Sequence, residues 1–127
     1  MQQKHLFEYA VIRVVPKVER EEFMNIGVIV YCAKERFLQC RYLPDDVRLK
    51  AFAVDLDIAD LKKHLCAFER ICSGTKTAGP IGALDAASRF RWLTATRSTI
   101  LQSSKVHPGM TENALETLER LFDQLVT

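Results

Sequence analysis

Residues 25–43 read NIGVIVYC AKER FLQCRYL, and this stretch decides the fold. Two runs rich in β-branched and aromatic residues, at 25–32 and 37–43, flank a short polar turn, which is the pattern of a β-hairpin. If Cys32 pairs with Phe37, alternate side chains point to opposite faces of the hairpin. One face then carries Ile29, Tyr31, Leu38 and Cys40, and the other carries Val30, Cys32, Gln39 and Arg41.

The hairpin register also bears on the cysteines. Cys32 and Cys40 point to opposite faces in this register, so they cannot form a disulfide, although a one-residue change in loop length would reverse this conclusion. The chain has no CxxC pair, and its three histidines do not fall at zinc-site spacing. We therefore expect no metal and no cofactor, and we interpret the cysteines as small core side chains: Cys32, Cys40, Cys66 and Cys72.

A further strand is predicted before the hairpin, at 7–15. Apolar residues occupy both of its alternating faces, which is typical of a central strand. Arg13 is the exception, and it shares a face with Tyr9 and Val11. Pro16 ends the strand, because proline has no N–H to donate to a neighbouring strand.

Helices are predicted after the hairpin. A short helix at 45–53 is capped by Asp45, and a longer one at 58–72 is capped by Asp57 and stopped by Gly74. The longer helix carries an apolar stripe at helical spacing, formed by Ile58, Leu61, Leu65, Phe68 and Ile71.

The C-terminal half has weaker signals. We expect a mobile Gly- and Pro-rich loop at 73–82, a helix at 83–93, a strand at 96–103 and a loop at 104–109. Thr111 is predicted to cap a last helix at 112–126, whose buried stripe contains Leu115, Leu118, Leu121, Phe122 and Leu125. Together the elements predict one α+β domain over residues 1–127, with an antiparallel or mixed sheet of about four strands covered by about three helices.

Composition excludes some classes of protein. Of 127 residues, 48% are hydrophobic and 27% charged, and the net charge of +2 is too small to imply nucleic acid or membrane by itself. The longest apolar run, 26–33, is far shorter than the roughly 20 residues of a membrane helix. The N-terminus lacks the pattern of a signal peptide. We therefore expect a cytoplasmic protein with no membrane partner.

A first candidate site is the corner formed by residues 22–27. Glu22 and Asn25 bracket two bulky apolar residues, and Gly27 lies inside a strand, where glycine often marks a bulge or a close approach of another backbone or a ligand. One interpretation is a pocket shared by Glu22, Asn25 and Arg13. The alternative is structural: Glu22 neutralises Arg13, Asn25 caps a turn, and Gly27 makes room for an aromatic ring.

A second candidate site lies between Ala86 and Thr111, where the sequence has no acidic residue. Arginine side chains suit phosphate or carboxylate, and the interleaved aromatic residues suit bases or cations. This favours a surface for an anion, nucleotide or nucleic acid, although ion-paired arginines on a solvated face would explain the same pattern. The residues concerned are Arg89, Phe90, Arg91, Trp92, Arg97, Ser98, Thr99, Lys105 and His107.

Catalysis has less support in the sequence. Ser98, Thr99 or Ser103 could act as a nucleophile with His107 as the base, but no GxSxG elbow or paired carboxylates accompany them. An enzymatic role is therefore the third hypothesis.

Four segments together resemble a known bacterial family. They are YAVIRVVP at 9–16, EFMNIGV at 22–28, RFRWLT with RSTI between 89 and 100, and VHPG at 106–109. Over nearly the whole chain this combination is similar to domain-of-unknown-function family 3037. The resemblance implies small bacterial proteins without an assigned activity, which accompany kinases resembling the HipA toxin. It points to these positions: Arg13, Glu22, Asn25, Gly27, Arg89, Arg91, Arg97, Ser98, Thr99 and His107.

The leading hypothesis is therefore a non-enzymatic module that binds another protein or regulates it. The resemblance implies a HipA-like kinase of a toxin–antitoxin or defence-like system as one such partner, and self-association is another. The alternatives are a module that binds phosphate, nucleotide or nucleic acid through the basic segment at 89–107, and an undetected hydrolase or transferase.

Overall fold

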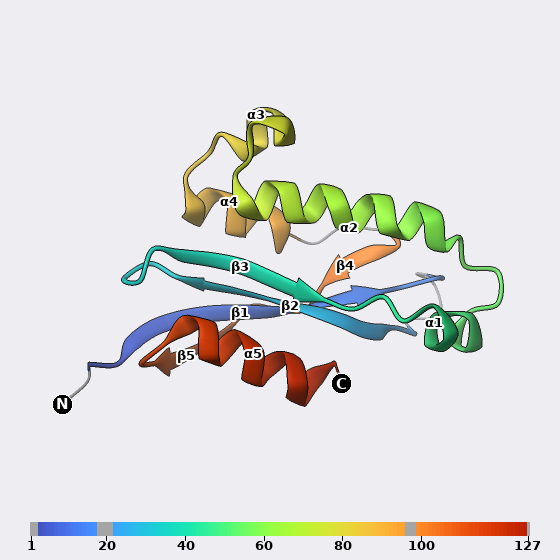
Figure 1. Cartoon of the computed structure of the whole chain (residues 1–127), viewed down its shortest axis with the longest axis horizontal. Coiled ribbons are helices and arrows are strands. Elements are labelled where there is room, and N and C mark those ends of the chain that lie inside the picture. Colours follow the sequence, from blue (N-terminus) through green and yellow to red (C-terminus); the bar gives the residue numbers. More distant parts are fainter. Residues whose placement is uncertain (1–2, 18–21, 96–98, 127) are drawn as a thin grey trace.

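The sheet is antiparallel and has one long central strand. A computed structural model describes residues 3–17, 22–95 and 99–126, and five strands lie within these ranges (Figure 1). Their order is β3-β2-β1, and both β4 and β5 pair with the other edge of β1. The strands are β1 (His5–Val14), β2 (Met24–Cys32), β3 (Phe37–Tyr42), β4 (Leu101–Ser103) and β5 (His107–Thr111).

Helices cover both faces of this sheet. Figure 1 shows α2 and α4 on one face, α5 on the opposite face, and α1 at one end of the sheet. The α+β class is thus confirmed, with more strands and helices than the sequence predicted. The helices are α1 (Asp46–Phe52), α2 (Ile58–Ser73), α3 (Gly79–Gly82), α4 (Ala86–Leu93) and α5 (Ala114–Leu125), with a 3₁₀ turn at Lys76–Ala78.

The predicted hairpin register is confirmed. Cys32 lies opposite Phe37, and Ile29 lies opposite Cys40. Ile29 packs under α2 and α4, whereas Cys32 packs on the α5 side, so the two hairpin faces are those that the sequence predicted. All four cysteines are free, but Cys66 is exposed, so its assignment to the core was wrong.

The helices α1 and α2 begin where polar caps were expected. The Asp45 carboxylate accepts the N–H groups of Val47 and Arg48, and the Asp57 carboxylate accepts that of Asp60. Gly74 ends α2 in the left-handed conformation with φ of 69°, which glycine adopts without steric cost.

The prediction of a loop at 104–109 was wrong in its second half, because β5 begins at His107. The sequence pattern was misleading because β5 contains Pro108 and Gly109, two residue types that are uncommon in strands. Pro108 is tolerated because β5 lies at an edge of the described sheet. Gly109 is required because a β-carbon there would lie 2.6 Å from Cε1 of Phe7. The late strand predicted at 96–103 begins later than expected, since Thr99 and Ile100 precede β4, and residues 96–98 lie outside the described residues.

Other boundaries differ from those predicted. Asn113, not Thr111, caps α5, and its side chain accepts the N–H of Glu116. The Thr111 hydroxyl instead bonds to that of Thr117 at 2.6 Å, and Leu115 is 47% exposed rather than part of the buried stripe. The predicted loop at 73–82 contains two short helical turns, and α4 begins at 86 rather than 83.

Two apolar clusters fill the space on either side of the sheet. The larger one, under α2 and α4, includes Ala10, Ile12, Val14, Leu65 and Phe90. The smaller one lies under α5 and includes Phe7, Val28, Val30, Leu118 and Phe122. None of the described helices is long and apolar enough to cross a lipid bilayer.

Candidate functional site

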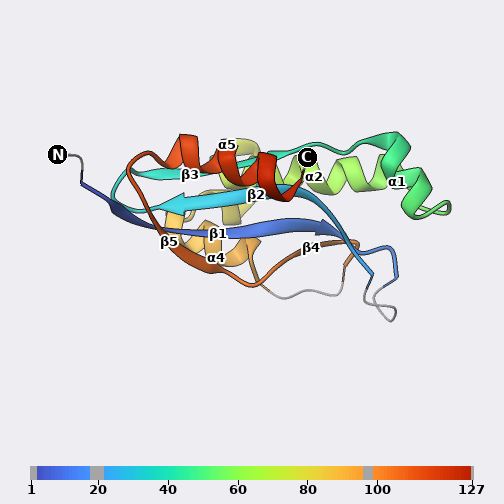
Figure 2. The same cartoon turned by 90° about the horizontal axis from the view of Figure 1, so that it is seen from below.

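The candidate site is the part of the sheet that α5 leaves uncovered. Seen from the α5 side, α5 runs along β2 and β3, and no described helix lies over β1, β4 and β5 (Figure 2). We call this region the open face, and define it by five side chains that line it: Tyr9, Arg13, Phe23, Asn25 and His107. Three of them, Arg13, Asn25 and His107, are sequence candidates.

An aromatic pair lies at one end of the open face. Tyr9 of β1 is opposite His107 of β5, and their ring centroids are 5.2 Å apart. His107 is exposed and Tyr9 is half-buried. The second pair lies four residues further along β1 from Tyr9, which in a strand is a distance of roughly 13 Å.

The second pair is a cation over an aromatic ring. The guanidinium carbon of Arg13 lies 4.0 Å from the ring centroid of Phe23, within the range of an attractive cation–π interaction. Phe23 is 47% exposed. Partial burial lowers the pKa of Arg13, because desolvation disfavours its charged form.

Asn25 fixes the border between the open face and α5. It lies opposite Arg13 in the β1–β2 register, and its side-chain N–H donates to the carbonyl of Leu125 at 3.2 Å. Two buried atoms here, Nε of Arg13 and Oδ1 of Asn25, have no hydrogen-bond partner among the described residues. Unsatisfied buried atoms are uncommon, and they leave this corner with hydrogen-bonding capacity for water or a ligand.

Gly27 has a structural role next to this corner. The β1–β2 register shifts between Ile12 and Arg13, so Gly27 follows an irregularity in β2. A β-carbon on Gly27 would lie 2.7 Å from the Arg41 carbonyl oxygen and 2.8 Å from Cβ of Tyr42. Both readings of a strand glycine, a bulge and a close backbone approach, therefore apply, and no side chain of this residue is available to a ligand.

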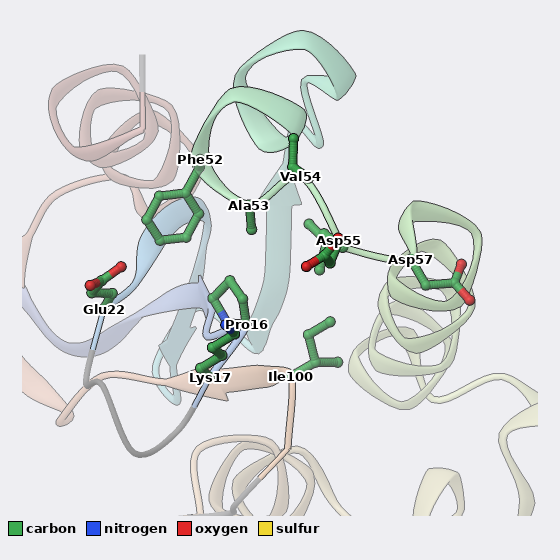
Figure 3. A pocket seen from close by; sticks show the side chains of 10 residues that line it. Pro16, Lys17, Glu22, Phe52, Ala53, Val54, Asp55, Asp57 and Ile100 are labelled. Atoms are coloured by element: carbon green, nitrogen blue, oxygen red, sulfur yellow. The ribbon is translucent and has the colours of Figure 1, made fainter.

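Glu22 lies away from the open face, in a pocket at the C-terminal end of β1. Figure 3 shows Glu22 on one side of the pocket with Phe52 above it, Asp55 and Ile100 on the opposite side, and Pro16 and Lys17 between the two sides. The pocket has a volume of about 230 Å³, below the roughly 300–1,000 Å³ of small-molecule sites. Its charged lining is Lys17, Glu22, Asp55 and Asp57, which does not favour an anion.

Arg89 serves the packing of α4 against α2. Its guanidinium donates to the carbonyls of Ile71 at 3.1 Å, Cys72 at 2.6 Å and Leu84 at 3.0 Å. Free carbonyls at the C-terminus of a helix need such donors, and a cation is favourable there. The sequence singled out a real feature in Arg89, and the contacts are those of a helix cap.

Arg91 lies on the other side of the sheet from His107. It reaches Glu8 of β1, with Nη1 and Oε2 3.4 Å apart and 65% of its side chain exposed. Glu8 pairs with Tyr31, whose ring stacks on Phe90 on the α2 side. The basic segment is therefore divided between two faces of the sheet and does not form one anion-binding surface among the described residues.

The candidate hydroxyl groups are engaged with the backbone. Thr99 Oγ1 donates to the Leu101 carbonyl at 2.6 Å, and Ser103 Oγ donates to the Ser104 carbonyl at 2.8 Å. Ser103 lies opposite Ile12, which points to the α2 side, so it faces away from His107. Two further candidates, Arg97 and Ser98, lie outside the described residues.

Sequence reasoning missed Tyr9 and Phe23 as members of the site. In the sequence each looked like an ordinary core residue, because a partly exposed aromatic residue and a fully buried one occupy the same positions in the alternation of apolar residues. The signal available was the shared face of Tyr9 and Arg13, which placed a cation among apolar side chains of a central strand. That no helix of the described part of the chain covers one side of this strand was not visible in the sequence.

Comparison with known proteins places the chain in a family. A model of a protein family of unknown function (DUF3037) matches residues 9–126, which include the whole open face. The chain belongs to this family. No curated protein and no solved structure matches the chain significantly. The DUF3037 description assigns no activity, so a function has to be argued from the site.

Proposed function

We propose that the chain is a non-enzymatic binding module that docks another protein on the open face. The observation that carries this proposal is the uncovered part of the sheet, which presents two pairs of side chains, Tyr9 with His107 and Arg13 with Phe23. Aromatic residues and arginine are enriched among the residues that contribute most to binding at protein interfaces.

The form of the site supports binding rather than chemistry. The side chains lie along extended strands, and Thr99 and Ser103 donate their protons to backbone carbonyls. A hydroxyl nucleophile needs a base within hydrogen-bond reach, and the His107 ring instead packs against the Tyr9 ring at a tilt of 33°. This supports the interpretation of His107 as a contact residue.

The chemistry of the open face indicates what the partner offers. Arg13 is a cation, Lys105 is an exposed cation in the segment between β4 and β5, and the rings of Tyr9 and Phe23 are apolar. The complementary surface carries an acidic group and apolar side chains. A HipA-like kinase, the partner that the family resemblance implies, is one protein to test, and a second copy of this chain is another.

Affinity capture with matched variants tests the proposal. The tagged wild-type chain is expected to retain a protein partner in stoichiometric amount from a native lysate, after nuclease treatment. Arg13→Glu is expected to reduce recovery at least tenfold, because it places a like charge against the acidic partner, a penalty of about 1.4 kcal/mol or more. Arg120→Glu on the exposed side of α5 is the control and should recover the partner as the wild type does.

Three results decide the matter. A wild-type chain that is a monomer and recovers no partner contradicts the proposal, and so does equal recovery by Arg13→Glu and Arg120→Glu. Loss of recovery only in variants of the open face supports it. Circular dichroism of each variant establishes that it is folded.

Single-stranded nucleic acid is a second candidate ligand. The pairing of aromatic rings with cations on the open face of an antiparallel sheet is the arrangement by which several single-strand binders stack bases. A labelled single-stranded oligonucleotide would then bind with an affinity that falls with salt and falls further in Arg13→Glu. Absence of binding at low salt would rule this candidate out.

A further inference from the structure

Three side chains with metal-binding atoms meet at the N-terminal end of β1, away from the two side-chain pairs of the open face. They are His5, Cys32 and Glu35, from the start of β1, the end of β2 and the turn that leads to β3. The ring nitrogen, the sulfur and a carboxylate oxygen all lie within 4.8 Å of one another. The sequence did not predict a metal site, so this cluster is new information from the structure.

The distances between the ligand atoms match a tetrahedral metal centre. His5 Nδ1 is 3.4 Å from Glu35 Oε2, and Cys32 Sγ is 3.8 Å from the same oxygen. Zinc bonds of about 2.0–2.3 Å to nitrogen, oxygen and sulfur, arranged tetrahedrally, separate the ligand atoms by roughly 3.3–3.7 Å. Two of the three edges thus need almost no adjustment, and the third, between His5 and Cys32, is no longer than 4.8 Å and so closes by at most about 1.5 Å.

A neighbouring backbone group orients one of these ligands. The other carboxylate oxygen of Glu35, Oε1, accepts the N–H of Ala114 at 3.0 Å, which leaves Oε2 directed toward His5 and Cys32. A partner of this kind, which fixes a ligand without touching the metal, is characteristic of metal sites. Cys32 is fully buried, and its thiol donates to the carbonyl oxygen of Leu6 at 3.4 Å, a hydrogen bond that is lost when the thiol gives up its proton to bind zinc.

We propose that His5, Cys32 and Glu35 form a zinc site with three protein ligands and one position occupied by water. The thiolate and the carboxylate together neutralise the charge of Zn²⁺, and the imidazole binds in its neutral form. A sulfur ligand beside nitrogen and oxygen selects zinc over calcium or magnesium, which require oxygen ligands.

Exposure of the site leaves room for the fourth ligand. The His5 and Glu35 side chains are 28% and 24% exposed, so one side of the cluster faces solvent. Cys32 closes the buried side. Zinc binding replaces the S–H bond with a Zn–S bond and releases the thiol proton to solvent, which makes the affinity rise with pH.

Cobalt provides the direct test, because Co²⁺ occupies tetrahedral zinc sites and has visible absorption. The reduced wild-type chain, titrated with Co²⁺, is expected to bind one equivalent and to show a thiolate charge-transfer band together with tetrahedral ligand-field bands. Zn²⁺ should displace the cobalt, and a chelator competition gives its affinity. Bound zinc should also raise the melting temperature, since it binds the folded chain.

Variants assign the signal to the cluster. Cys32→Ser is expected to abolish the charge-transfer band. His5→Ala and Glu35→Gln should each weaken zinc binding by ~10–100-fold or more, because replacing residues that only contact a ligand already has an effect of that size. Glu35→Gln keeps an oxygen that can accept the Ala114 N–H, so its effect is not one of folding. Cys66→Ser and His64→Ala change an exposed cysteine and an exposed histidine, and they should leave binding unchanged.

Two results would overturn the proposal. One is a folded wild-type chain that takes up neither cobalt nor zinc. The other is binding that persists unchanged in Cys32→Ser and His5→Ala, which would mark surface adsorption. The test does not depend on the protein partner, so it stands or falls separately from the proposed binding function.

Discussion

The two sides of β1 differ although they alternate along one strand. On the α2 side, Ala10, Ile12 and Val14 are at most 1% exposed and are all aliphatic. On the other side, Phe7 and Val11 are buried as well, at 4% and 6% exposure, whereas Tyr9 and Arg13 are half-buried and polar or aromatic. Both sides therefore contribute to the core, and the open side has in addition two partly exposed residues of types that a core does not require. The comparison teaches that function should be sought where a strand keeps partial exposure in the middle of a sheet.

The largest expected effect contrasts two phenylalanines. Phe90 is fully buried on the closed side and stacks on Tyr31, so Phe90→Ala is expected to lower the free energy of unfolding by about 3–5 kcal/mol. Phe23→Ala on the open side removes an exposed ring and its contact with Arg13, at a cost below about 1 kcal/mol. Urea denaturation of both variants measures the difference. Equal losses would contradict the division into a closed and an open side.

A middle-sized effect is expected from two arginines of α4. Arg89→Ala removes three donors from backbone carbonyls and should cost about 1.5–3 kcal/mol, because hydrogen bonds from charged donors are stronger than neutral ones. Arg91→Ala removes one exposed ion pair with Glu8 and should cost no more than about 1 kcal/mol. Chemical denaturation of both variants distinguishes the structural arginine from the surface one. The reverse order would show that the Glu8 pair is needed to attach α4 to the sheet.

The smallest effect concerns the charge that caps α4. The Ser88 N–H, 2.7 Å from Oδ1 of Asp85, lowers the pKa of this carboxyl below its ordinary value of 3.8. A lowered pKa stabilises the folded chain above that ordinary value, and the stabilisation is lost as the pH falls through the folded pKa. Asp85→Asn keeps a capping oxygen without the charge. The small advantage of the wild type at neutral pH should therefore vanish in denaturation curves measured in acid, and an advantage that persists there would contradict this account.

Local signals account for what was predictable in the fold. The β2–β3 register follows from the hairpin turn and alternating side chains, and the caps Asp45, Asp57 and Gly74 follow from residue type and spacing. The pairing of β1 with β5 was not predictable. It joins His5 to Thr111 at the opposite end of the chain, and Pro108 and Gly109 disguise the strand.

The candidate sites show the same limit. Arg13 and His107 were assigned to two separate candidate sites because each stood out from its local pattern, and the structure places both on the open face beside aromatic partners that did not stand out. Arg89 and Arg91 were grouped with them by sequence proximity, whereas the sheet separates them from His107. The cluster of His5, Cys32 and Glu35 was missed because His5 meets Glu35 only after β1 has paired with β2.

The pairing of two short strands, β4 and β5, with one edge of β1 has a consequence for the order of folding. One edge of β1 is completed by β2, close in sequence, and the other by β4 and β5, which are synthesised about a hundred residues later. Closing that loop costs chain entropy that local hairpins do not incur, so the β2–β3 hairpin is expected to form early and the β1–β5 pairing late. In the native state β5 should separate from β1 first, and the amide hydrogens of β5 should then exchange faster than those of β2. The edge that completes the open face is therefore also the edge at which we expect the chain to begin to unfold.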